Sequence, residues 1–447
     1  MYYDKKIAYY TLGCKLNFSE TSTISRSLSD LGYGKVDFEE NADIYIINTC
    51  SVTENADKRC RALVRQIKKR NTLSKVIIIG CYAQLKPKAI SEIEGVDLVL
   101  GANEKFSIDK HLPLLESKNE SLVFADEIKE VNFFKGSYSQ GERTRSFLKI
   151  QDGCDYFCSF CTIPHARGKS RSTTIENTLK LAKEVANTGI KEIVITGVNI
   201  GDFGKVESGK KRTEENFTQL VKEFDKIKQI KRWRISSIEP NLLTDEIIEF
   251  VSKSNNFVPH FHIPLQSGSD KLLKLMRRKY LSKLYVEKVS KIKNIMPHCN
   301  IGVDVIVGFP GETEEEFLVT YNFLKELDIS YLHVFTYSER NNTKALEITP
   351  VIAINKRRER SKMLRSLSLK KKRAFYEKFV GTTRKVLFES VDDDGNISGF
   401  TDNYIKVQVP YKNGLENSIF NVKLIEISRL GNMIGQIEEN INEITVN

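Results

Sequence analysis

Three cysteines near the middle of the chain have the spacing of a metal centre. Cys154, Cys158 and Cys161 are separated by three residues and then by two. A structural zinc site has four ligands, commonly in paired Cys or His sets, and the four-iron cluster of a ferredoxin has a cysteine at each of its four corners. Three thiolates on one short loop therefore predict a four-iron cluster with one iron left open for chemistry. A zinc knuckle or a set of free thiols is the alternative.

A second set of cysteines recurs at equivalent places in the first third of the chain. Cys14, Cys50 and Cys81 each follow a predicted strand (7–12, 44–48 and 76–79) and precede a predicted helix (about 19–31, 56–69 and 87–93). Buried β-branched runs alternating with helices predict a parallel sheet, and ligands collect at the carboxyl ends of such strands. We therefore expect these three cysteines to meet at one edge and to form a second cluster site. Cys60 and Cys299 fit neither set and are interpreted as structural thiols.

The two sets must be positioned by different parts of the chain. Residues 140–375 contain six strand candidates separated by helices, at 146–151, 192–198, 232–238, 260–265, 302–309 and 331–337. This order predicts an open (β/α)6 relative of the eight-stranded barrel, in which function lies on the loops after the strands. The loop with Cys154 follows the first of these strands, as that architecture requires.

The last part of the chain, 378–447, changes to short alternating strands. They are expected at 384–389, 397–400, 404–409, 418–427 and 433–437, with hairpin signals at 392–395 and 413–414. Five short strands predict a small all-β barrel of a kind that often carries RNA. Arg384, Lys385, Tyr404 and Lys406 are candidate RNA contacts. The alternative is that they form the core and the solvated surface of the barrel.

Composition and charge narrow the class of protein. The 447 residues are 28% charged and 40% hydrophobic, which is typical of a soluble globular protein. The sequence shows no secretory signal and no apolar run long enough to span a bilayer, so we expect a cytoplasmic protein without a membrane partner. The net charge is +11, and the stretch 356–373 holds ten basic residues and one acidic residue. That density favours RNA, although a solvated helix face is the plainer alternative.

The central motif resembles the signature of the radical S-adenosylmethionine (SAM) enzymes. In that family the open iron binds the amino and carboxylate groups of SAM, and reductive cleavage gives a 5′-deoxyadenosyl radical. The resemblance implies that Phe160 lies near the adenine of SAM. It also implies that Thr196, Gly197, Asn199 and Gln266, on the loops after the second and fourth strands, are candidate SAM contacts.

All three segments together resemble the methylthiotransferases, which join an N-terminal cluster domain (1–135), a radical SAM barrel (140–375) and a TRAM domain (378–447). The resemblance rests on the contexts of the six cysteines, among them Thr11-Leu-Gly-Cys14-Lys-Leu-Asn17, Asn48-Thr-Cys50-Ser-Val-Thr53 and Cys161-Thr-Ile-Pro164. Within the family, Lys-Leu-Asn after Cys14 and Ser236-Ser-Ile-Glu239-Pro resemble the branch that acts on threonylcarbamoyladenosine in tRNA. The isopentenyladenosine and ribosomal-protein branches are the nearest alternatives.

The resemblance implies an activity, cofactors and partners. We expect methylthiolation at C2 of N6-threonylcarbamoyladenosine at tRNA position 37, next to the anticodon. The cofactors would be SAM and two 4Fe-4S clusters, one held by Cys14, Cys50 and Cys81 and the other by Cys154, Cys158 and Cys161. The partners would be the tRNA anticodon stem-loop and a low-potential electron donor of the flavodoxin or ferredoxin type. A non-catalytic iron–sulfur or zinc RNA-binding protein is the alternative from a different class.

Overall fold

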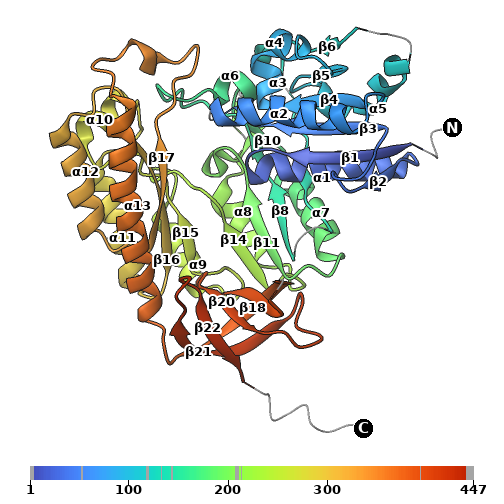
Figure 1. Cartoon of the computed structure of the whole chain (residues 1–447). Coiled ribbons are helices and arrows are strands. Elements are labelled where there is room, and N and C mark those ends of the chain that lie inside the picture. The colour runs from blue at the N-terminus through green and yellow to red at the C-terminus, as the bar shows by residue number, and fades with distance from the viewer. Residues whose placement is uncertain are drawn as a thin grey trace, which may run out of the picture.

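A computed structural model describes residues 5–51, 54–116, 120–131, 133–141, 144–206, 211–212, 214–392 and 394–438. The chain forms three units (Figure 1). An N-terminal α/β unit lies at one end of a central α/β unit, and a small β-barrel lies at the other end. Among the described residues, no helix combines the length and the apolar character that a membrane span requires.

The N-terminal unit is built on one six-stranded sheet. Its strands lie in the order β2-β1-β3-β4-β5-β6, and every neighbouring pair is parallel. The middle strands are buried runs of branched side chains, as expected for a sheet covered on both faces. The elements are β1 Lys6–Thr11, α1 Lys15–Asp30, β2 Gly34–Val36, β3 Ile44–Thr49, α2 Glu54–Arg70, β4 Lys75–Gly80, α3 Cys81–Leu85, α4 Pro87–Ser91, β5 Leu98–Leu100, α5 Ile108–His111 and β6 Leu122–Phe124.

The central unit carries six parallel strands in chain order. Strands β8, β11 and β14 pair in one sheet and β15, β16 and β17 in another, and a parallel bridge between Ser237 and His262 joins the two. The two-residue strand β7 pairs antiparallel with β8. The elements are β7 Ser137–Tyr138, β8 Arg145–Lys149, β9 Gln151–Asp152, α6 Ile163–Arg167, β10 Arg171–Ser172, α7 Ile175–Ala186, β11 Glu192–Thr196, β12 Lys205–Val206, β13 Lys211–Arg212, α8 Phe217–Phe224, β14 Arg232–Ile235, α9 Asp245–Lys253, β15 His260–His262, α10 Asp270–Leu275, α11 Ser282–Ile295, β16 Asn300–Val307, α12 Glu314–Glu326, β17 Tyr331–Thr336 and α13 Ile354–Glu377.

Local sequence explains how several of these helices begin. Thr174, Thr244, Ser269 and Thr313 precede α7, α9, α10 and α12, and each side chain accepts a hydrogen bond from a backbone N–H in the first turn. The helices pack an apolar face on the sheet, where Trp233 of β14 is fully buried and stacks on Phe224. In the described part of the chain, short 3-10 helices lie at Glu104–Phe106, Leu112–Glu116, Ile128–Glu130, Ile200–Asp202 and Lys344–Glu347.

The C-terminal unit is a closed barrel of five strands in the order β18-β19-β20-β22-β21. The strands are β18 Thr383–Val391, β19 Asn396–Thr401, β20 Lys406–Pro410, β21 Ile419–Ile427 and β22 Met433–Ile437. The all-β architecture agrees with the sequence analysis. Closure of the barrel leaves no open sheet edge.

Some element boundaries differ from the sequence-based expectation. Helix α1 begins at Lys15 rather than near residue 19, because Cys14 has extended dihedral angles and directly precedes the first turn. The predicted strand 404–409 begins at Lys406, since Tyr404 lies in the preceding turn with a φ of 69°. The third helix of the N-terminal unit begins at Cys81 itself. Cys14 and Cys81 therefore stand at helix starts, whereas Cys50 follows β3 and lies before α2.

Candidate active site

The N-terminal cysteines come together at the carboxyl edge of the sheet. Strands β1, β3 and β4 are neighbours, with Thr11 opposite Asn48 and Thr49 opposite Gly80. Cys14, Cys50 and Cys81 follow these strand ends. Cys14 is exposed, Cys50 is half-buried and Cys81 is buried. The expectation that the three strand-ending cysteines share one edge is therefore consistent with the observed register.

Two glycines make this close approach possible. Gly13 has a φ of 117°, and a Cβ built there would lie 2.7 Å from Cβ of Cys50. Gly80 has a φ of 97°, and a Cβ there would lie 2.4 Å from Oδ1 of Asn48. Each glycine directly precedes a cysteine, so these positions need both the left-handed backbone and the missing side chain.

The central cysteines lie on the loop between β9 and α6. The backbone N–H of Cys161 donates to the carbonyl of Cys158 over 3.0 Å, and the N–H of Cys154 donates to the carbonyl of Gly168 over 3.0 Å. Nη1 of Arg278 donates to Sγ of Cys158 over 3.1 Å, while Nη2 pairs with Glu239. The sequence analysis missed this contact of Arg278, because Arg278 lies 117 residues or more from the cysteine loop in sequence and is brought there by the turn after α10.

Burial sets the protonation of these thiols. It raises the pKa of both Cys154 and Cys161 to about 12 and also raises the pKa of Cys158, where the Arg278 guanidinium acts in the opposite direction. A cysteine binds a metal as its thiolate. A positively charged centre bound at this loop would favour the thiolate over the buried thiol.

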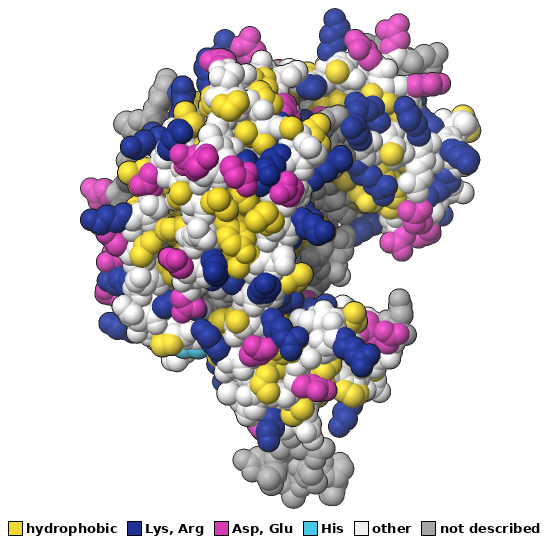
Figure 2. All heavy atoms as spheres, turned by 60° about the vertical axis from the view of Figure 1, so that its left-hand side comes forward, with side chains coloured by type: hydrophobic (Ala, Val, Ile, Leu, Met, Phe, Trp, Pro, Cys, Tyr) yellow, Lys and Arg dark blue, Asp and Glu magenta, His cyan; other side chains and the backbone are white. Residues whose placement is uncertain are grey.

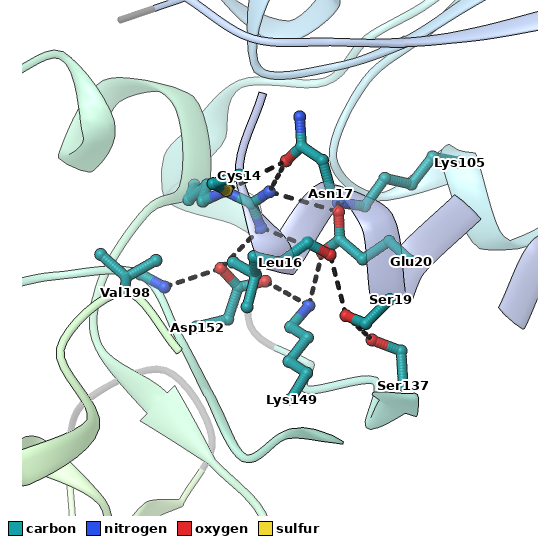
Figure 3. A network of polar contacts seen from close by, with 12 residues as sticks. Cys14, Leu16, Asn17, Ser19, Glu20, Lys105, Ser137, Lys149, Asp152 and Val198 are labelled. Atoms are coloured by element: carbon teal, nitrogen blue, oxygen red, sulfur yellow. Dashed lines mark hydrogen bonds and ion pairs between the residues drawn. The ribbon is translucent and has the colours of Figure 1, made fainter. Parts of the chain in front are cut away.

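The two cysteine sets are tied together by a buried ion network (Figure 3). Glu20 of α1 accepts from Lys105, Lys149 and Arg167 at 2.7 to 2.9 Å. Asp152 of β9 pairs with Lys149 at 2.6 Å and with Arg167 at 3.0 Å. Burial alone raises the pKa of Glu20 and Asp152, but the surrounding cations lower both well below their ordinary values. The network therefore holds two carboxylates ionised between the N-terminal and central units.

Neither cysteine set has the compactness of a single-ion site. Within the described part of the chain, three candidate ligand atoms lie within 4.8 Å of one another only at His262, Asp304 and His333. Zn–S bonds of about 2.3 Å need a tight tetrahedral set.

Comparison with known proteins identifies the family. Residues 148–324 match the Radical SAM superfamily, and residues 6–101 match the uncharacterized protein family UPF0004. The chain is 37% identical, over 98% of both chains, to a threonylcarbamoyladenosine tRNA methylthiotransferase of Bacillus subtilis. A protein of the same name from Aquifex aeolicus is 39% identical over 90% of this chain and 96% of its own. This chain belongs to the radical SAM methylthiotransferase family. It is an enzyme, and the cofactors of its family are SAM and four-iron clusters.

A solved structure agrees on the fold. The radical SAM methyltransferase TsrM from Kitasatospora setae superposes with a TM-score of 0.56 over 74% of this chain and 73% of its own, at 13% sequence identity. That likeness supports a radical SAM fold for this methylthiotransferase, with its parallel α/β unit and its small β-barrel.

The residues of this methylthiotransferase fit a bound SAM beside the central cysteines. Phe160 and Gln266 line a mostly apolar cavity of about 200 Å³ together with Cys161, Ile306 and Tyr337. Gln266 has a φ of 69° at the end of the fourth parallel strand. The apolar walls suit an adenine ring, so two of the predicted SAM contacts lie where such a ring has room.

The other predicted SAM contacts lie at the end of β11, which Thr196 closes, and on the loop that follows it. A Cβ at Gly197 would come within 2.8 Å of Ile200 and 3.1 Å of Gln151, so the loop packs tightly there. Thr196 turns back and donates to its own strand at Val194. Asn199 is buried beside Tyr156, and neither its Nδ2 nor its Oδ1 forms a hydrogen bond of ordinary geometry with a described residue. Of the three, Asn199 therefore has polar atoms left for a ligand.

The four predicted RNA contacts fall into two groups. Tyr404 and Lys406 line a cavity of about 570 Å³ between the barrel and the central strands. Arg384 and Lys385 line a separate depression, where Arg384 forms a two-bond ion pair with Asp402. The Asp402 carboxylate of the same barrel thus compensates part of the charge of Arg384.

A chamber links Cys14 to the barrel, and the sequence analysis missed the cations Lys15, Arg145 and Arg234 in its walls. Lys15, Arg234 and Tyr404 line both the 570 Å³ cavity and an adjoining cavity of about 260 Å³ that also contains Cys14. Burial and the nearby charges of Arg234 and Arg145 lower the pKa of Lys15 to about 7. Arg145 is the first residue of β8, Arg234 lies within β14, and both strands are buried. The sequence pattern therefore gives no sign that these two side chains line a cavity.

Proposed function

We propose that this protein methylthiolates C2 of N6-threonylcarbamoyladenosine at position 37 of tRNA. The observation that carries the proposal is the chamber that runs from Cys14, through Lys15 and Arg234, to Tyr404 and Lys406 of the barrel. A base that entered from the barrel side would meet the N-terminal cysteines at the far end. The similarity to threonylcarbamoyladenosine tRNA methylthiotransferases over nearly the whole chain supports the same substrate.

Each part of the chain then has a role in the proposed enzyme. Cys154, Cys158 and Cys161 would hold the SAM-binding cluster, and Cys14, Cys50 and Cys81 the second cluster. Phe160, Gln266 and Asn199 would hold SAM, with Thr196 and Gly197 shaping the loop. Together, the clusters and SAM supply the one-electron chemistry that an unactivated aromatic C–H requires. The protein itself supplies ligation, a dry cavity and the orientation of the base.

The three units correspond to 1–135, 140–375 and 378–447 in this proposal. The six parallel strands in chain order support an open (β/α)6 radical SAM barrel for the second, and the closed five-stranded barrel supports a TRAM domain for the third. The substrate would be the anticodon stem-loop, whose unpaired bases can be turned out of the stack. The enzyme would work in the cytoplasm with a flavodoxin- or ferredoxin-type electron donor.

Mass spectrometry of tRNA nucleosides tests the substrate. We expect a strain lacking this gene to lose the 2-methylthio derivative of threonylcarbamoyladenosine and to keep threonylcarbamoyladenosine itself. Restoring the wild-type chain should restore the derivative, whereas the Cys158→Ala variant should not. Loss of a methylthiolated isopentenyladenosine, or of a modified ribosomal protein, would assign the chain to another substrate.

Anaerobic reconstitution tests the alternative of a non-catalytic RNA-binding protein. The proposal expects about eight irons per chain, as two four-iron clusters, and SAM-dependent release of deoxyadenosine. One zinc per chain with no SAM turnover would contradict it.

A further inference from the structure

The chamber between Cys14 and the barrel contains more positive charge than its own carboxylates compensate. Nζ of Lys15 has no ion pair and no hydrogen bond with any described residue. Arg234 has Glu192 at 3.5 Å from its Nε, but the same carboxylate lies 4.0 Å from Nη1 of Arg232. One buried glutamate thus serves two guanidiniums, and the Lys15 ammonium has no described partner of its own.

The other charged groups around the chamber do not remove this excess. Arg145 is already engaged, since it pairs with Glu389 at 2.6 Å and donates to the Tyr404 hydroxyl. On the opposite strands, the Asp304 carboxylate lies 2.8 Å from Nε2 of His262 and attracts Lys15 only in part, since burial and the Arg234 and Arg145 charges outweigh it in lowering the pKa of Lys15. The remaining titratable groups that line the cavity are His333 on β17 and Lys372 and Lys406 near the barrel, and none of them adds negative charge.

Since Lys15 and Arg234 are also close enough to repel a cation, this environment disfavours a metal ion at His262, Asp304 and His333.

The aromatic floor of the chamber fixes the orientation of Arg234. Its guanidinium carbon lies 4.0 Å from the centroid of the Tyr404 ring, and that ring stacks on Phe400 at 4.4 Å. A guanidinium held over a ring keeps its N–H edge free for a planar anion. Lys15 is the first residue of α1, so the positive end of that helix lies at the same place.

We propose that Lys15 and Arg234 bind the carboxylate of the threonylcarbamoyl group on the target adenosine. This inference rests on the proposed function. Threonine joined to the base through its nitrogen keeps a free carboxylate, which two cations can bind by charge-assisted hydrogen bonds. An isopentenyl group has no charge, and enclosing it here would leave both cations desolvated and uncompensated. The two residues therefore select the substrate rather than perform the chemistry.

The test compares anticodon stem-loops of one sequence that differ only at position 37. The three RNAs carry threonylcarbamoyladenosine, unmodified adenosine or isopentenyladenosine, and dissociation constants are measured on anaerobically reconstituted enzyme at a single salt concentration. Wild-type enzyme should bind the first RNA about ten- to a hundredfold more tightly than the other two, the range for hydrogen bonds to a charged group. Lys15→Met and Arg234→Met should each weaken binding of the first RNA much more than binding of the other two, which removes most of that preference.

A control variant separates local recognition from general charge. Lys372 lines the same cavity from α13, 4 residues before Tyr376, and Lys372→Met should keep the preference for threonylcarbamoyladenosine. Because Lys15 adjoins Cys14, iron content is measured for each variant, and Lys15→Arg should restore the preference. If Lys15→Met loses iron, the Arg234→Met variant still tests the inference, because Arg234 is not adjacent to a candidate cluster cysteine in the sequence.

Other outcomes would overturn the inference. If Lys15→Met and Arg234→Met weaken all three RNAs equally, the cations bind an RNA phosphate, and if the preference survives in both variants, the carboxylate is bound elsewhere. Failure of the proposed function is a different result, in which wild-type enzyme shows no preference and produces no methylthiolated threonylcarbamoyladenosine.

Discussion

Nη2 of Arg167 donates a hydrogen bond over 2.6 Å to Oδ1 of Asn17. Asn17 follows Cys14 by three residues, and Arg167 follows Cys161 by six. Two side chains that are 150 residues apart in sequence therefore connect the loop of Cys14 with the loop of the central cysteines. Asn17 is itself fixed, since its Nδ2 donates to the carbonyls of Leu12 and Thr49. Any movement of one candidate cluster relative to the other must break this connection.

Glu20→Gln should destabilise the junction between the two units. The change removes the carboxylate that compensates Lys105, Lys149 and Arg167, and breaking a buried ion pair costs about 3–5 kcal/mol in the free energy of unfolding. Chemical denaturation at pH 7 measures this cost. Glu176→Gln, which breaks an exposed pair with Lys180, should leave the free energy of unfolding nearly unchanged.

The effect of Glu20→Gln should depend on pH in a fixed direction. The cations lower the pKa of Glu20 in the folded chain below its ordinary value of 4.5, so the carboxylate contributes stability above pH 4.5 that is lost as the pH falls. The difference in unfolding free energy between wild type and variant should thus be largest near neutral pH and should shrink in acid. A difference that grows below pH 4.5 would contradict an ionised Glu20.

Gly13→Ala and Gly80→Ala should each disrupt the N-terminal cysteine set. An added Cβ meets Cys50 in one case and Asn48 with Thr49 in the other, and both positions have a positive φ. After anaerobic reconstitution, each variant should hold about half of the wild-type iron, because the central cysteines are untouched. Gly34→Ala is the matched control: the added Cβ has no neighbour closer than 3.9 Å, and iron content should be unchanged.

The sequence predicted the scaffold of the site well because its signals are local. Strand, cysteine and helix follow one another three times in the N-terminal unit, so the shared edge could be inferred from periodicity and from the rule for parallel sheets. The buried partners could not be inferred in this way. Arg278 contacts Cys158 across 120 residues, and Glu20 is a charged residue inside an otherwise ordinary amphipathic helix. Their roles depend on which units pack together, and no local pattern encodes that packing.

Cys158→Ala and Cys50→Ala should separate the two cysteine sets. Cys158→Ala should abolish deoxyadenosine release, because the SAM-binding cluster loses a ligand. Cys50→Ala should keep SAM cleavage and lose sulfur insertion into RNA. Deoxyadenosine is measured by chromatography and methylthiolated nucleoside by mass spectrometry. If Cys50→Ala still methylthiolates tRNA, the N-terminal set does not hold the second cluster.

Some basic side chains of α13 are buried and others are exposed. The composition of 356–373 did not reveal this difference. Arg357 and Arg360 are buried, and Arg360 donates to Glu312 over 2.7 Å. In contrast, Arg358, Lys362, Arg365 and Lys370 are exposed. Figure 2 shows Lys and Arg side chains on this face and on the barrel, with a hollow beside them. Contact between α13 and RNA phosphates outside the chamber would therefore involve exposed cations, not Arg357 or Arg360.

Replacing Arg358, Lys362 and Arg365 together by Gln should weaken tRNA binding and flatten its salt dependence. Each lost phosphate contact lowers the slope of log K against log salt by about 0.7 to 0.9. Binding of tRNA by the folded, reconstituted enzyme is measured between about 50 and 200 mM salt, the range over which phosphate contacts dominate. Arg360→Gln on the same helix should instead lower thermal stability and leave the salt slope of the folded fraction unchanged, because Arg360 is committed to Glu312 and Glu314. An unaltered slope in the triple variant would mean that the barrel and the chamber bind the tRNA without α13.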